Sequence, residues 1–185
     1  MKQKKPGWPL ILALSIAGLC LLCCLVLGVV VALAPKFYTT TLENSSLKTG
    51  TSAPDFALTT LSGEFVHLSD FKGQPVLLTF GASWCPDCRK EVPLLNDLHE
   101  THPQLVILLV DSKESAELVR TYADEMKITH PILLDPDGKV SEQYRVFAIP
   151  TELFIDANGI IRAKIIEQVT PGLLAEYLPL IGLNP

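Results

Sequence analysis

Apolar residues follow three patterns along this 185-residue chain. Residues 10–34 form one long uncharged run in which only Ser15, Gly18 and Gly28 are not apolar. Further on, short apolar runs bounded by Gly, Pro or Asp predict buried strands, and apolar residues spaced three or four positions apart predict helices. Strands are expected at 76–80, 105–110, 132–134, 151–155 and 160–166, and helices are expected from Pro86 onward and at 112–126, 140–144 and 171–181.

The order of these elements predicts the fold class. Strands alternate with helices up to residue 150, and the last two strands form a hairpin around Asn158-Gly159, a dipeptide typical of tight turns. Shorter strands are expected before residue 76, on either side of a turn at Ser62-Gly63. We therefore expect an α/β domain in which helices flank a central mixed sheet.

The apolar run is long enough to cross a membrane. As a helix it would span about 37 Å, more than the roughly 30 Å of a hydrocarbon core. Lys2, Lys4 and Lys5 precede it, and this charge bias orients the N-terminus toward the cytoplasm. We predict a cytoplasmic N-terminus at 1–9, one transmembrane helix at 10–34 as a single-pass anchor in the cytoplasmic membrane, a linker at 35–48 and an extracytoplasmic domain at 49–185.

Two features of the N-terminal segment have alternative interpretations. Ala32-Leu33-Ala34 has the spacing of a signal-peptide cleavage site, although Pro35 directly after it disfavours cleavage. Cys20, Cys23 and Cys24 share one helical face. They would serve there as small apolar side chains in lipid or, alternatively, as sites of acylation or of an intermolecular disulfide.

Composition and charge narrow the class of function. The net charge of -5 offers no broad basic surface, so nucleic acid is not an expected partner. Two of the five cysteines lie in the predicted domain and three in the apolar run, which is not the pattern of a disulfide framework.

Cys85 and Cys88 stand where a buried strand, a short turn of small residues and a helix succeed one another. Pro86 suits a first helical turn because its missing N–H would have no partner there. The helix N-terminus stabilises an anion, and a thiolate is the nucleophile in disulfide exchange. We expect Cys85 to be reached by solvent and to attack a partner disulfide, and Cys88, one turn on, to resolve the mixed disulfide.

Three other interpretations of the cysteine pair agree less well with the sequence. A structural zinc site needs four ligands, and His99 and His102 lack the usual spacing, so no metal is expected. A purely structural disulfide would close too small a loop to gain much stability. Two inert buried thiols fit poorly with the charged neighbours Asp87 and Arg89. A redox-active disulfide between Cys85 and Cys88 is the favoured interpretation.

The segment Trp84-Cys85-Pro86-Asp87-Cys88, with Ile149-Pro150-Thr151 further on, resembles the thioredoxin fold. More closely, residues 49–182 resemble the membrane-anchored TlpA/ResA-like thiol-disulfide oxidoreductases of the redoxin (AhpC/TSA) superfamily. The resemblance implies a thioredoxin-like fold with an N-terminal extension and a central insertion. It also implies a cis bond before Pro150, opposite the cysteines, and substrate contacts from Trp84, Pro86, Ile149 and Pro150.

Acidic residues around the pair are expected to tune it. By the same resemblance, Glu91 is a candidate proton carrier, although an exposed helix glutamate is an equal alternative. Thr79 stands where thioredoxin has a buried acid, which leaves Glu91 as the better candidate. The negative charge of Asp87 disfavours the Cys85 thiolate, whereas the positive charges of Arg89 and Lys90 favour it. Weak stabilisation of the thiolate favours a reducing couple.

Two other functions on this fold are less well supported. A peroxiredoxin would have a threonine three positions before its reactive cysteine, where this chain has Ala82. A copper-delivery protein, the non-enzymatic alternative, typically has three residues between its cysteines and a downstream histidine, whereas this chain has two and no histidine after His130. We therefore expect an enzyme without a cofactor that reduces disulfides in partner proteins. By the resemblance, apocytochrome c is a candidate substrate, and general disulfide reduction in the periplasm or at the cell surface is equally compatible. A separate membrane thiol-disulfide donor would supply the electrons.

Overall fold

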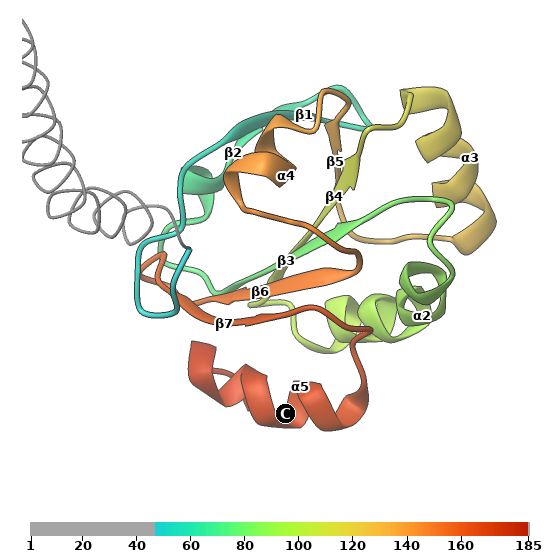
Figure 1. The fold of residues 1–185 in the computed structure, drawn as a ribbon. Helices are drawn as coiled ribbons and strands as arrows, with labels where there is room; N and C mark the ends of the chain where they lie inside the picture. The colour runs from blue at the N-terminus through green and yellow to red at the C-terminus, as the bar shows by residue number, and fades with distance from the viewer. Residues whose placement is uncertain (1–46, 185) are drawn as a thin grey trace, which may run out of the picture. The chain divides into compact units, whose positions relative to one another are not determined.

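The computed structural model describes residues 47–184, whose strands form one mixed sheet of seven in the order β2-β1-β5-β4-β3-β6-β7 (Figure 1). Strands β3, β4 and β5 are parallel, and β1, β2, β6 and β7 pair in antiparallel fashion. The strands are β1 Ala57–Thr60, β2 Phe65–His67, β3 Val76–Gly81, β4 Val106–Ser112, β5 Ile132–Asp135, β6 Thr151–Ile155 and β7 Ile161–Ile165. The helices are α2 Pro86–Thr101, α3 Ala116–Met126, α4 Lys139–Gln143 and α5 Pro171–Tyr177, with 3-10 turns η1 Leu68–Phe71 and η2 Leu178–Ile181.

Strand β3 lies inside the sheet, between β4 and β6, and is buried along its whole length. Its side chains therefore pack into a hydrophobic core on each face of the sheet. Val76, Leu78 and Phe80 pack with α4 and the N-terminal segment. Leu77 points to the other face, which is covered by α2 and α5, and α3 packs on α2, β4 and β5. Figure 1 shows α4 and α5 on opposite sides of β3 and β6. Thr79 and Gly81 share the face of Leu77, so this is the face on which the cysteine helix lies.

The predicted elements are present, and two helix boundaries differ by more than two residues. The helix expected from residue 112 begins at Ala116, because β4 continues to Ser112 and Ser115 caps the helix by accepting the Leu118 N–H at 3.4 Å. The last helix becomes a 3-10 turn after Tyr177, since Pro179 has no N–H for a continuing α-helix.

The segment before β1 is joined to β7 by backbone hydrogen bonds. Gly50 N–H donates to Ile161 O at 2.7 Å, and Ile161 N–H donates to Thr51 O at 2.9 Å. Within residues 47–184, no helix is both long enough and apolar enough to cross a bilayer. The anchor expected at 10–34, its three cysteines and most of the linker lie outside the described residues.

Candidate functional site

The turn between β3 and α2 places both cysteines at the start of the helix. Cys85 is the N-cap residue, with extended backbone (φ -80°, ψ 114°), and Pro86 occupies the first turn. A disulfide joins Cys85 to Cys88, with 5.2 Å between their Cα atoms. The Cys85 Sγ also accepts the Cys88 N–H at 3.1 Å, so an otherwise unpaired helix donor points at this sulfur.

In this oxidised form both cysteines are buried, with exposed fractions of 3% for Cys85 and 2% for Cys88. The expectation that solvent reaches Cys85 is therefore wrong for the disulfide state, because the bond directs its sulfur toward Cys88. Gly81 at the end of β3 lies directly beneath. A Cβ there would be 3.4 Å from Cys88 Sγ and 3.3 Å from Leu109 Cδ1, so a larger residue would make tight contacts with both side chains.

The charged residues beside the cysteines pair with other groups. Lys90 Nζ lies 2.7 Å from Asp87 Oδ1. Arg89 forms an ion pair with Glu125 at 2.7 Å and donates to Ser83 O at 3.1 Å. Lys90 thus offsets the charge of Asp87, as expected. The Arg89 side chain is directed toward α3 instead, and the sequence did not reveal this.

The loop in front of Cys85 is held by a residue that sequence reasoning missed. Glu114, between β4 and α3, accepts the Ser83 N–H at 2.5 Å and the Ser83 hydroxyl at 2.7 Å. This double acceptor orders the loop from a segment 31 residues away. No local pattern around Glu114 would have indicated it.

Glu91 is buried, with an exposed fraction of 2%, so the interpretation as an exposed helix glutamate is wrong. It lies one turn after Cys88 on the same buried face of α2. Its Oε2 accepts the Val169 N–H at 3.1 Å. Burial raises the pKa of Glu91 to about 7, so its proton exchanges in the neutral range.

A second buried carboxyl, Glu152, lies across the sheet from Thr79. The two residues are direct partners in the β3–β6 pairing, and the Thr79 hydroxyl donates to Glu152 Oε2 at 2.5 Å. Glu152 is fully buried, and burial together with the charge of Glu91 raises its pKa well above the ordinary value. The inference that Thr79 leaves this place without an acid was wrong, because β6 supplies one. The available signal was a glutamate inside the apolar strand after Pro150.

Asp111 is a third buried carboxyl on this face, and sequence reasoning missed it too. It pairs with Gly81 in the β3–β4 register and is 1% exposed. Burial, with the nearby Glu114, raises the pKa of Asp111 to about 8. Three carboxyls thus lie on the sheet face that carries the cysteine helix.

The peptide bond between Ile149 and Pro150 is cis, as the resemblance implied. Pro150 leads directly into β6, whose first residue, Thr151, pairs with Phe80 of β3. The Thr151 hydroxyl donates to Ala148 O at 2.6 Å and holds this turn. The Ile149 backbone makes no hydrogen bond with the other described residues, so its N–H and C=O are open to a ligand.

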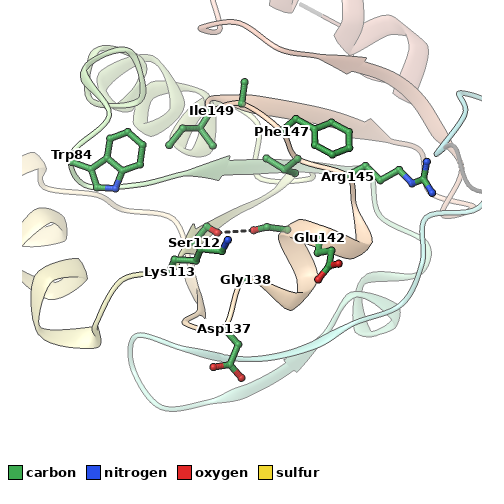
Figure 2. A pocket seen from close by; sticks show the side chains of 12 residues that line it. Trp84, Ser112, Lys113, Asp137, Gly138, Glu142, Arg145, Phe147 and Ile149 are labelled. Atoms are coloured by element: carbon green, nitrogen blue, oxygen red, sulfur yellow. Dashed lines mark hydrogen bonds between the residues drawn. The ribbon is translucent and has the colours of Figure 1, made fainter.

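A groove of about 770 Å³ begins beside Trp84 and Ile149 and runs past Lys113, Arg145 and Phe147. Figure 2 shows Trp84 and Ile149 on one side of it and Arg145 on the other. Trp84 is 68% exposed and Phe147 87% exposed. Large aromatic side chains at this level of exposure are typical of surfaces that bind a partner.

Two residues of the groove adopt left-handed backbone conformations, Lys113 at φ 64° and Arg145 at φ 51°. Such conformations cost energy for residues other than glycine and persist where the surroundings hold them. Here the Lys164 ammonium donates to the carbonyls of Tyr144 and Arg145 at 3.0 and 2.9 Å. The wall of the groove is therefore built by specific contacts.

Comparison with known proteins shows which family this sequence and fold belong to. A profile of the AhpC/TSA family matches residues 49–164. This chain belongs to the AhpC/TSA family. The thiol-disulfide oxidoreductase ResA of Bacillus thuringiensis subsp. konkukian is 31% identical over 138 residues, covering 74% of this chain and 80% of the relative. The thioredoxin-like protein YneN of Bacillus subtilis is 39% identical over 120 residues, covering 63% and 70%.

A solved structure of a putative thiol:disulfide interchange protein DsbE from Chlorobium tepidum has a TM-score of 0.70 and 29% identity. The similarity covers 74% of this chain and all of that one. Within the AhpC/TSA family, this chain is thus a thiol-disulfide oxidoreductase with a thioredoxin-like fold, as its ResA-like motifs indicated.

Proposed function

We propose that this oxidoreductase reduces disulfide bonds of partner proteins on the outer side of the cytoplasmic membrane. The observation that carries the proposal is the groove beside the cysteine turn, with its exposed aromatic residues and the open backbone of Ile149. An extended polypeptide segment is the ligand that pairs with a free backbone and packs on aromatic side chains. Trp84, Pro86, Ile149 and Pro150 are its proposed contacts.

In the proposed reaction the reduced Cys85, as a thiolate, attacks a disulfide of the partner. A bond forms between Cys85 Sγ and one partner sulfur, and the other partner sulfur leaves as a thiolate that takes up a proton. Cys88 then gives its proton to Glu91 and attacks Cys85 Sγ. The Cys85–Cys88 disulfide forms, and the second partner thiolate leaves and takes up the proton held by Glu91. Two electrons pass from the cysteine pair to the partner.

The direction of electron flow is supported by the charges around Cys85. Arg89 is committed to Glu125 and Ser83, and Lys90 is committed to Asp87. The helix N-terminus and the Cys88 N–H therefore remain as the main stabilisers of a Cys85 thiolate. Modest stabilisation of the reduced form gives a reducing couple. A membrane thiol-disulfide donor is proposed to return the pair to the dithiol form.

The partners are proposed to lie near the membrane. Residues 10–34 would anchor the chain with its N-terminus in the cytoplasm, and residues 35–48 would tether the catalytic domain outside. Apocytochrome c is one candidate partner, since haem attachment requires both of its cysteines to be reduced. General reduction of misformed disulfides is the other use of the same chemistry.

The reduction potential of the full-length protein, equilibrated with dithiothreitol or glutathione, tests the direction. We expect a value near or below about -270 mV, the range of thioredoxin. A value near about -120 mV, typical of a disulfide-forming oxidase, would overturn the proposal and reverse the flow of electrons.

The roles of the two cysteines are tested by trapping. Cys88→Ser should accumulate a mixed disulfide with the partner through Cys85, whereas Cys85→Ser should accumulate none and lose reductase activity. Non-reducing electrophoresis followed by mass spectrometry identifies the trapped partner. A mixed disulfide that forms equally well in Cys85→Ser would exchange the roles of the two cysteines.

A further inference from the structure

Glu91 and Glu152 come from different elements but lie on the same face of the sheet, and each affects the titration of the other. Glu91 projects from α2 one turn after Cys88 and accepts the Val169 N–H through Oε2. Glu152 projects from β6, and its Oε2 accepts the Thr79 hydroxyl. The exposed fractions are 2% for Glu91 and 0% for Glu152.

The remaining oxygen of Glu152 has no donor. Among the described residues nothing donates to Glu152 Oε1, although the atom is fully buried. An unpaired buried carboxylate is costly, and two such charges side by side are more so. If Oε1 carries a proton, it becomes a donor, and the Glu91 carboxylate is then its acceptor. One shared proton therefore satisfies the orphaned atom and reduces the pair to a single negative charge.

Among the described residues, no ion pair links Glu91 or Glu152 to a basic side chain. On α2, Arg89 is bound to Glu125 and Ser83, and Lys90 is bound to Asp87. The other titratable groups around the pair are acidic or neutral, and come from α2, β4, the loop after β4 and α3: Asp87, Cys88, Asp111, Glu114 and Tyr122. None of these neutralises a second carboxylate, so the shared proton is the remaining means of balancing the charge.

We propose that Glu152 is a positioning residue that stays protonated and donates its hydrogen to Glu91, thereby setting how readily Glu91 accepts the proton of Cys88. The proposal deepens the function described above and rests on it for the role of Glu91. During exchange the Cys88 proton moves to Glu91 and then to the leaving thiolate. Glu152 keeps its own proton throughout, and neither carboxyl changes oxidation state.

The direction of the pKa shifts agrees with this division of roles. Burial raises the pKa of Glu91, and the proposed hydrogen bond from Glu152 opposes this effect. Burial and the charge of Glu91 raise the pKa of Glu152, and the proposed hydrogen bond raises it further. Glu152 is thus the donor in the pair, and Glu91 is the member that titrates near neutrality.

Carboxyl ¹³C NMR of the oxidised full-length protein in detergent, with labelled glutamate, tests the proposal. Glu91→Gln and Glu152→Gln identify the two resonances by their loss. We expect the Glu91 resonance to titrate near neutral pH while the Glu152 resonance stays in its protonated position. A Glu152 resonance that titrates below that of Glu91 would overturn the proposal.

Substitutions at residue 152 give a second test, in which the direction of the shift in the Glu91 titration midpoint decides. Glu152→Leu removes the donor and should raise the Glu91 midpoint by about one pH unit or more. Glu152→Gln keeps an N–H donor and should leave the Glu91 midpoint within about half a pH unit of its wild-type value. If Glu152 were instead the charged member, both variants would lower the midpoint, because a negative charge would be lost.

Thr79→Val is the matched control, since it changes the same buried site without touching the donor to Glu91. It should leave the Glu91 midpoint within about half a unit. The acidic limb of the rate of disulfide reduction should move with the Glu91 midpoint in Glu152→Leu and stay unchanged in Glu152→Gln. The NMR titration is independent of the direction of electron flow, so it stands or fails separately from the proposed reductase function. Should Glu152→Leu not fold, the wild-type titration and Glu152→Gln still decide.

Discussion

Two buried aspartates at the ends of neighbouring parallel strands have opposite surroundings. Asp135 at the end of β5 accepts three hydrogen bonds, from Val140 N–H at 3.2 Å and from the N–H and hydroxyl of Ser141, both at 2.8 Å. Asp111 in β4 accepts none from the described residues. The first carboxylate stabilises the start of α4, whereas the second is an ionisable group that burial disfavours in its charged form.

Asp111→Asn should therefore stabilise the domain at high pH. Because the pKa of Asp111 is raised to about 8, the folded protein holds a proton that the unfolded chain has lost, and stability falls as pH rises from about 4 to about 8. Asparagine removes this loss and keeps a donor toward Glu114. We expect the variant to be more stable by about 1–3 kcal/mol at pH 8.5, with the difference shrinking toward pH 5. Urea unfolding of the oxidised protein at both pH values measures it.

Asp135→Asn is the matched control for this change. It should lower stability by about 1–3 kcal/mol at both pH values, because two backbone donors and a hydroxyl lose their carboxylate. Equal destabilisation by the two substitutions would show that Asp111 is ionised in the folded protein and well accommodated.

At the scale of elements, what the sequence predicts depends on how far apart the interacting residues lie. The strand, turn and helix around Cys85 were predictable because every signal for them lies within residues 73–98. The partnership of Thr79 with Glu152 was not, since these residues are 73 positions apart and meet only through the pairing register of β3 and β6. Asp111 and Glu114 reach the site in the same way, through β4. The cysteine motif could therefore be recognised from the local sequence. The acids around it come together only through strand pairing in the folded sheet.

The contact between α2 and the segment leading into β5 contains two histidines, of which His130 is buried and His99 is half-buried. His99 and His130 have ring centroids 6.3 Å apart, and neither ring nitrogen of His130 has a partner among the described residues. Burial, with a smaller effect of His99, lowers the pKa of His130 to about 4. The folded domain therefore resists a proton that the unfolded chain accepts below about pH 6.5.

This pair should make the domain sensitive to mild acid. Since the unfolded chain binds the extra proton, the stability associated with neutral His130 is complete above about pH 6.5 and is lost as pH falls toward 4. His130→Leu removes that loss. Between pH 7 and pH 5, wild type should lose about 1–2 kcal/mol more than the variant, as measured by urea unfolding. His67→Leu, at a partly exposed position in β2, is the control and should follow wild type. Parallel pH profiles for wild type and His130→Leu would contradict the prediction.

At the scale of the whole domain, Tyr144 connects three parts of the chain that are distant in sequence. It follows α4, and its ring lies 5.9 Å from that of Phe56 and 5.5 Å from that of Phe80 in β3. Its hydroxyl donates to the carbonyl of Pro54 in the N-terminal segment. That segment also donates from Ala53 N–H to Gly159 O at 2.8 Å, beside β7. Tyr144 thus ties the segment that follows the linker to the core of the catalytic domain.

Tyr144→Phe should loosen this attachment while keeping the ring packing. Loss of the buried hydroxyl leaves the Pro54 carbonyl without its donor, so we expect stability to fall by about 1–2 kcal/mol. Amide exchange at Ala53 should accelerate by about 5–30-fold, because the segment before β1 opens locally before the sheet does. Hydrogen exchange followed by NMR or mass spectrometry measures both effects. Tyr177→Phe, whose ring packs on Phe154 on the other face of the sheet, is the control and should leave exchange at Ala53 unchanged. Equal exchange at Ala53 in wild type and Tyr144→Phe would show that the hydrogen bonds to β7 alone hold the N-terminal segment in place.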